Sequence, residues 1–334
     1  MVDCNPNYAN FKGVSNFGET GLLTELENNL KQYLQWSFLD IGAWTNVSAD
    51  TGDAVQDGYT GQVDTLRWVS DPSYTDGQVW QSTRKDWVYE SGVNFDPGTG
   101  SVDPSGSTPQ IYTSTNDVWS GPIADSAYTI NYPLGRVIFD TAHDTDESVK
   151  ATYSYRNVQV YVADNAEWWR ELQLRSWRSD DLHFTQDDRT GDWSVGAHDR
   201  IQLPAIVVEA VPRGISRGYE LGNTSLWIEQ DMVLHVLADD RTMRNKLVSL
   251  LQVQADHTIW LFDSDSVAAS GAFPLDYSGD RVNGNVYPDI VSDTDYRWKK
   301  CTFRNVVVSD VEAMHPRLYE GTVRITCELV FGNA

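Results

Sequence analysis

Turn-forming clusters recur at short intervals through the first half of the chain and limit how long the segments between them can be. Between residues 48 and 125, runs such as SADTGDAVQDGYTG, SDPSYTDGQ and FDPGTGSVDPSGSTP separate brief stretches rich in Trp, Tyr and Val. Gly, Pro, Asp and Ser favour tight turns, whereas aromatic and β-branched residues favour strands. The pattern predicts a β-rich module with long loops.

Two segments have helical periodicity instead. In residues 20–39, apolar side chains recur at steps of three and four and form a stripe on one helix face, with Thr20 as the predicted N-cap. Residues 241–254 have the same spacing, and Asp239 or Asp240 precedes them as a predicted N-cap. A short helix is also predicted after Asp164.

Alternation with period two predicts several longer strands. In the strand that precedes the second helix, one face is the predicted core face; it carries Ile228, Met232, Leu234 and Val236. The closing strand alternates in the same way, with Val323, Ile325, Cys327, Leu329 and Phe331 on its apolar face. Residues 148–162 are predicted to form a strand with one buried face, which carries Val149, Ala151, Tyr153 and Tyr155.

Together these elements predict an α+β fold, in which an antiparallel sheet is flanked by two helices and carries a large β-rich insertion. The predicted division assigns residues 1–47 to the N-terminal helix of the core, 48–199 to the inserted module and 200–334 to the remainder of the core.

Charge and composition exclude several classes of protein. The net charge of −23 repels phosphate, so sequence-specific nucleic-acid binding is not expected. A hydrophobic content of 40% favours a folded protein over a disordered one. No apolar run reaches the length of a membrane span, and no export signal begins the sequence. The three cysteines predict neither a disulfide framework nor a zinc site, and a reducing cytoplasm fits their number.

The sequence offers no cofactor site and no metal site. The six histidines, His143, His183, His198, His235, His257 and His315, are dispersed along the chain, and His235 is predicted to be structural. The acidic groups Asp144/Asp146/Glu147, Asp263/Asp265 and Asp293/Asp295 do not fit a calcium-binding loop and are predicted to be solvated. Neither HExxH, GxxxxGK[ST] nor a strand followed by GxGxxG occurs, so we expect no enzyme.

Segments in the last third of the chain resemble the tail-terminator and neck proteins of tailed bacteriophages. The resemblance is carried by LPAIVVEAV, GYELGN, WIEQDMVLHVLADDRTMRNKLVSLLQ, TIWLFD and the closing RLYEGTVRITCELVF, after a helix near the start. YPLGRVIFD and VKATYSYRNVQVYV are similar to β-rich passages of larger head-to-tail joining proteins. The chain is longer than a minimal terminator.

This resemblance implies a structural virion protein, made in the host cytoplasm, that forms a ring at the head–tail junction. Six-fold symmetry is favoured, with twelve-fold as the alternative. The implied partners are other neck and connector proteins and the tail tube or sheath, with DNA passing through the ring and no membrane involved.

Two groups of residues are predicted to form subunit contacts. One is the positive charge on the second helix, namely Arg241, Arg244 and Lys246, which would dock on a neighbour's carboxylates. A solvated helix face explains these charges equally well. The other is a set of tryptophans in the β-rich module, Trp68, Trp80, Trp87 and Trp119.

Two other functions remain open. The 13 tryptophans and many acids also fit a carbohydrate-binding or carbohydrate-active protein. A baseplate or tail-fibre adaptor is the other alternative.

Overall fold

A computed structural model shows how these elements are arranged. It describes residues 20–47, 65–88, 109–169, 200–218, 225–261, 299–310 and 318–331, apart from isolated positions inside those ranges, together with short pieces near residues 95, 101, 185 and 194.

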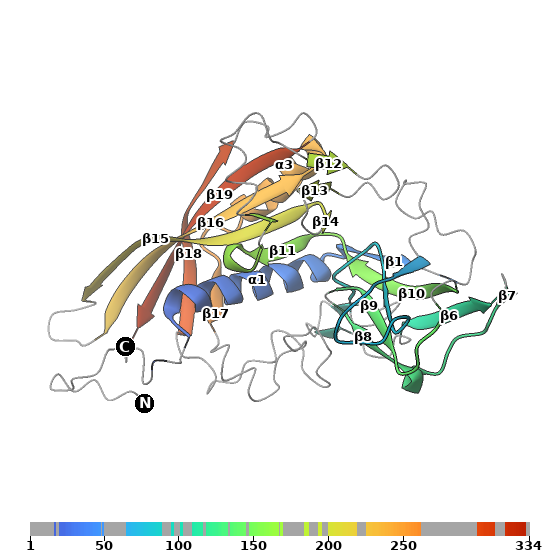
Figure 1. Cartoon of the computed structure of the whole chain (residues 1–334). Helices are drawn as coiled ribbons and strands as arrows, with labels where there is room; N and C mark the ends of the chain where they lie inside the picture. The colour runs from blue at the N-terminus through green and yellow to red at the C-terminus, as the bar shows by residue number, and fades with distance from the viewer. Residues whose placement is uncertain are drawn as a thin grey trace.

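The largest unit is a curled six-stranded sheet of mixed direction (Figure 1). Its strand order is β11-β15-β16-β19-β18-β17, and β11 runs parallel to β15 while the other neighbours are antiparallel. The bounds are β11 Gln159–Val162, β15 Ala205–Gly218, β16 Leu226–Ala238, β17 Thr258–Leu261, β18 Lys299–Asp310 and β19 Tyr319–Phe331.

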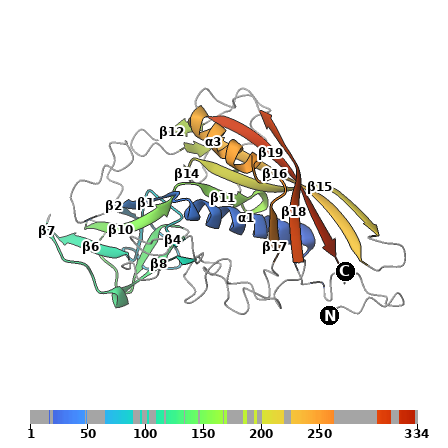
Figure 2. The ribbon, with the colours of Figure 1, turned by 180° about the vertical axis from the view of Figure 1, so that it is seen from behind.

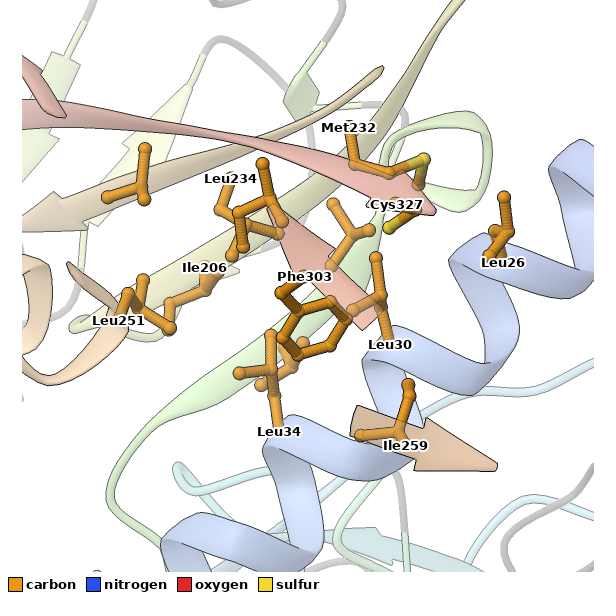
Figure 3. Packing of buried hydrophobic residues seen from close by; sticks show 14 of the residues in the cluster. Leu26, Leu30, Leu34, Ile206, Met232, Leu234, Leu251, Ile259, Phe303 and Cys327 are labelled. Carbon is orange, nitrogen blue, oxygen red and sulfur yellow. The ribbon is translucent and has the colours of Figure 1, made fainter. Parts of the chain in front are cut away.

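Two helices, α1 (Leu22–Asp40) and α3 (Arg241–Gln252), pack against the apolar face of this sheet. In Figure 3, Leu30 and Leu34 of α1 lie around the ring of Phe303, and Leu251 of α3 lies near Ile206. The core faces predicted for β16 and β19 are confirmed, because Met232, Leu234, Val236, Val323, Ile325, Cys327 and Leu329 are all buried in this cluster.

The two helix starts differ in how they are capped. The second helix is confirmed with Asp240 as its N-cap, since the Asp240 side chain accepts a hydrogen bond from the backbone N–H of Met243 at 3.0 Å. The first helix begins at Leu22 with Gly21 as N-cap and no side-chain capping bond, so Thr20 was wrongly predicted as its cap.

A second sheet of eight strands has its own core. The strand order is β7-β6-β10-β2-β3-β9-β8, with β1 also paired to β10. The Trp87 ring stacks on Tyr153 at 4.1 Å between centroids, and the buried face of β10 carries the predicted Val149, Ala151, Tyr153 and Tyr155. The bounds are β1 Trp44–Val47, β2 Thr65–Trp68, β3 Val79–Gln81, β6 Gln110–Thr115, β7 Val118–Trp119, β8 Tyr128–Asn131, β9 Arg136–Phe139 and β10 Ser148–Arg156.

The predicted fold class is therefore wrong. The described chain is mostly β, built from two curled sheets and only two α-helices, and it is not an antiparallel sheet flanked by two helices with an insertion. The error has a physical cause: the second sheet buries its own apolar cluster and is a core in its own right. The parallel β11–β15 pair also makes the first sheet mixed.

The chain enters and leaves the eight-stranded sheet at one place. The backbone N–H of Asn157, which follows β10, donates to the carbonyl of Ala43, which precedes β1, at 2.9 Å. Residues 148–162, predicted as one strand, are two: β10 ends at Arg156 and β11 joins the other sheet. The predicted module boundary at residue 199 therefore lies well beyond this crossing.

A third, smaller cluster covers part of the opposite face of the six-stranded sheet. It contains Trp168, Trp169, Val207, Leu237 and Leu318. The remaining described elements are the 3-10 helices Asp125–Ala127 and Ala163–Asn165, the pair β4 (Phe95–Asp96) and β5 (Ser101–Val102), and the small sheet of β12 (Phe184–Gln186), β13 (Trp193–Val195) and β14 (Arg200–Ile201). Among the helices the structure describes, none is long and apolar enough to cross a membrane.

Candidate functional site

A pocket of about 430 Å³ lies where α1, α3 and the two sheets meet. This volume is within the range of small-molecule and side-chain binding pockets, about 300–1,000 Å³. We call it the junction pocket; its lining is Phe38, Ile41, Gly42, Ala43, Thr45, Arg84, Tyr155, Arg156, Asn157, Val158, Gln202, Leu203, Pro204, Asp239, Met243, Lys246, Leu247 and Leu250.

The junction pocket is basic, although the protein as a whole carries a net charge of −23. Three cations, Arg84, Arg156 and Lys246, line it, against the single carboxylate of Asp239 among the lining residues. Arg84 and Arg156 are only 8% and 6% exposed, whereas Lys246 is exposed at the rim. A pocket lined by more cations than carboxylates favours an anionic ligand.

The two arginines are held by the eight-stranded sheet. The guanidinium of Arg84 lies over the Tyr155 ring, 5.2 Å from its centroid. The Arg156 backbone N–H donates to the carbonyl of Asp86 at 3.1 Å, and Asp86 has a positive φ of 52°. The side-chain Nε of Arg156 is buried and has no hydrogen-bond partner among the described residues.

Charges close to the pocket are partly removed from water. Burial raises the pKa of the Asp86 carboxyl, while the nearby charges of Arg156, Lys31 and Lys85 act in the opposite direction. Burial lowers the pKa of the Lys31 ammonium, and the charge of Asp86 opposes that shift. Asp86 therefore lies close enough to Arg156, and to Lys31 of α1, to interact with their charges.

The basic region continues beyond the pocket. A neighbouring hollow of about 220 Å³ is lined by Arg67 and Lys85 and shares Gln202 with the junction pocket. The Gln202 side-chain oxygen accepts the backbone N–H of Lys85. This hydrogen bond connects the loop that follows β3 to the segment that precedes β15.

The three cations predicted on the second helix lie in different environments. Arg241 is exposed, and Lys246 lies at the junction pocket. Arg244 is buried, and its Nη1 donates to the Glu320 carbonyl at 2.9 Å. A Cβ at Gly321 would lie 2.9 Å from Arg244 Cδ, so this glycine allows the arginine to lie flat on β19. Arg244 therefore attaches α3 to the sheet and is not available to a neighbour.

The four predicted tryptophans divide into two pairs. Trp80 and Trp87 are buried in the core of the eight-stranded sheet, and their indole N–H groups donate to the carbonyls of Gly77 and Arg84, each at 2.9 Å. Trp68 and Trp119 are exposed. The Lys150 ammonium lies 4.5 Å from the Trp119 ring centroid. Only the second pair is placed to contact another molecule.

The described histidines have structural partners. His235 contacts Glu320 at 2.9 Å through Nδ1 and Glu209 at 3.0 Å through Nε2, which confirms the structural role predicted for it. His143 contacts Glu147, and His257 stacks on Tyr33. The described residues contain no group of three or more His, Cys, Asp or Glu side chains that could hold a metal ion. Outside the described residues lie His183, His198, His315, Asp146, Asp263, Asp265, Asp293 and Asp295.

One further segment of the sequence, not considered above, matches the GxSxG pattern of a nucleophile elbow. It is GISRG, Gly214–Gly218. An elbow requires a turn from a strand into a helix. The structure instead places all five residues in the exposed end of β15, so the match carries no catalytic argument.

No local pattern indicates Arg84 and Arg156 as pocket residues, because the lining comes from segments far apart in the chain. Comparison with protein-family models found no match, and comparison with curated proteins found no significant match. The likeness to phage neck proteins therefore remains a prediction from the sequence.

Proposed function

We propose that the protein is a structural subunit without catalytic activity, which joins copies of itself head to tail into a closed ring. We further propose, from the sequence resemblance, that this ring lies at the head–tail junction of a tailed phage and surrounds the DNA channel. Neck, connector and tail proteins are its proposed partners.

The observation that carries the ring proposal is that exposed apolar side chains lie at opposite ends of the molecule. At one end, β7 carries Val118 and Trp119, which are 72% and 40% exposed. At the other end, the last part of β15 carries Ile215, which is 55% exposed (Figures 1 and 2). We call these the β7 patch (Val118, Trp119) and the β15 tip (Arg213–Gly218).

The β15 tip offers Ile215 as an exposed apolar contact, because its charges are paired within the chain: Arg217 with Glu229 at 2.7 Å and Arg213 with Asp231 at 3.9 Å. All its residues are exposed, and Arg213 and Arg217 stand on either side of Ile215 in the sequence. Because the β7 patch and the β15 tip are different surfaces, a contact between them is heterologous. Repetition of such a contact gives a ring when the rotation closes on itself and an open filament when it does not, and we propose the closed form. An enzyme would need a constellation of reacting groups, and the junction pocket supplies cations without a nucleophile–base pair.

A complementation experiment tests head-to-tail contact. Trp119→Ser damages the β7 patch alone and Ile215→Ser damages the β15 tip alone, so each variant should stay monomeric in light scattering where the wild type forms rings. A mixture of the two still has one intact patch and one intact tip, so it should form heterodimers and nothing larger. Trp260→Ser, which removes an exposed tryptophan from β17, is the matched control and should assemble normally.

Monomers of the wild type at all concentrations would contradict the ring proposal. A mixture that remains monomeric would contradict the head-to-tail contact. The virion location has its own test: gold-labelled antibody should mark the head–tail junction in electron micrographs. Label at the baseplate or fibres, or hydrolysis of glycans by the purified chain, would favour the alternative functions.

A further inference from the structure

The junction pocket contains a combination of groups that the ring proposal does not explain. Its cations and its apolar lining face the same space. Arg156 ends β10, Arg84 lies in the loop after β3, and Lys246 comes from α3. Desolvated arginines bind planar anions through several parallel hydrogen bonds.

The rest of the lining selects among anions. Phe38, Val158, Leu203, Leu247 and Leu250 give the pocket apolar walls. Inorganic phosphate would leave these walls in contact with water or with its own hydration shell. An organic acid fills both parts, because its carboxylate reaches the cations while its body covers the apolar walls.

We infer that the junction pocket is a binding site for a carboxylate carried on an apolar body. Arg156 and Arg84 hold the carboxylate, and Lys246 at the rim contributes a third positive charge. The carboxylate has two possible sources: an acidic segment of a second copy of the chain, or a free organic acid. The first source rests on the proposed function, because it requires that copies of the chain assemble. The acidic composition of the chain makes such segments abundant on any neighbouring copy.

Binding of 3-phenylpropionate to the full chain tests the inference by calorimetry. The wild type should bind 3-phenylpropionate, and it should bind neither the neutral 3-phenylpropionamide nor inorganic phosphate. Lys246→Gln should weaken binding about tenfold, the usual effect of losing one hydrogen bond to a charged group. Arg241→Gln is the matched control, because Arg241 lies on the same helix, is exposed and does not line the pocket.

Arg156→Gln should abolish binding, and circular dichroism shows whether that variant still folds. If the Arg156→Gln variant does not fold, the Lys246→Gln variant still tests whether the pocket binds the carboxylate, because Lys246 is exposed and its substitution leaves the core intact. Equal binding of the acid and the amide, tighter binding of phosphate, or equal affinity in Lys246→Gln and Arg241→Gln would each overturn the inference.

Light scattering with the probe present distinguishes the two sources. Dissociation of rings by saturating 3-phenylpropionate, but not by the amide, identifies the carboxylate as that of a second copy. Unchanged rings identify a free organic acid. Failure of the two proposals can also be told apart: a ring-forming chain that binds no probe removes only the pocket inference, whereas a monomer that binds it removes only the ring.

Discussion

Arg244 shows how a charged residue can be assigned to the wrong surface when only its charge is considered. It is buried together with Leu247, Val248 and Leu251, and steps of three, four and seven residues separate it from them. It therefore lies on the apolar face of α3, where its stem packs and its guanidinium reaches a backbone carbonyl. Helical spacing, applied to the cations as well, would have separated Arg244 from Lys246, which is two residues away, whereas Arg241 is exposed as the first residue of the helix.

The tryptophans lead to a prediction at this scale. Trp80→Ala and Trp87→Ala should each lower the free energy of unfolding by about 3–5 kcal/mol, because each empties a packed core position. Trp68→Ala and Trp119→Ala should cost less than about 1 kcal/mol, because these side chains are partly in water. Urea unfolding of the four variants measures the difference. Equal losses in both pairs would show that burial does not separate them.

Glu27 gives a pH-dependent prediction. This buried carboxylate accepts the backbone N–H of Ala210 at 2.9 Å. Burial raises its pKa, the charges of Asp164 and Glu209 add to the rise, and the bond from Ala210 partly offsets it. Because the folded pKa lies above the unfolded one, the stabilisation is complete below the unfolded pKa and is lost as the pH rises through the folded value.

Glu27→Gln should therefore be more stable than the wild type at pH 7, because glutamine keeps the acceptor without the charge. The advantage should shrink as the pH falls through the folded pKa and level off below the unfolded pKa of about 4.3, where the wild-type carboxyl becomes protonated in both states. Thermal unfolding between pH 4 and 8 measures it. Parallel stability curves over this range would contradict the assignment.

Elements with strong local signals were predictable, and elements defined by distant partners were not. The periodicity of α1 and α3, the Asp240 cap and the buried faces of β16 and β19 all follow from spacing along the chain. The separation of β10 from β11 is marked only by a change of phase, from odd-numbered apolar residues up to Tyr155 to even-numbered ones from Val158, and the sheet that each strand joins depends on distant hydrogen-bond partners. The junction pocket was unpredictable for the same reason.

The cap of α3 leads to a prediction for this element. Asp240→Ala should lower the free energy of unfolding by about 1 kcal/mol, since the N–H of Met243 loses its acceptor. Asp239→Ala removes a neighbouring charge but not the capping bond, so it should cost less. Chemical denaturation of the two variants at the same ionic strength measures both losses. If Asp239→Ala proves as costly as Asp240→Ala, charge near the helix end matters more than the cap.

The molecule as a whole is dominated by like charge. Its exposed ion pairs, such as Arg304–Glu328 at 3.1 Å and Arg217–Glu229 at 2.7 Å, contribute little in water. With a net charge of −23, the acidic side chains repel one another in the folded state. Salt weakens this repulsion, and the screening length is about 10 Å at 0.1 M.

We therefore expect the free energy of unfolding to rise when sodium chloride is raised from about 10 mM to about 300 mM, over which the screening length falls several-fold. Guanidinium is itself a salt, so urea is the denaturant to use. Falling stability over this range would show that the ion pairs outweigh the net repulsion.

The backbone hydrogen bond between Asn157 and Ala43 brings together the two ends of the segment that forms the eight-stranded sheet. The chain before β1 and the chain after β10 are therefore adjacent, so a linker of a few residues would join them if the segment between were removed. Removal or replacement of that segment would leave the covalent connections among α1, α3 and the six-stranded sheet unchanged. Thr45, Arg84, Tyr155 and Arg156 would leave with it, so the junction pocket would lose both of its arginines.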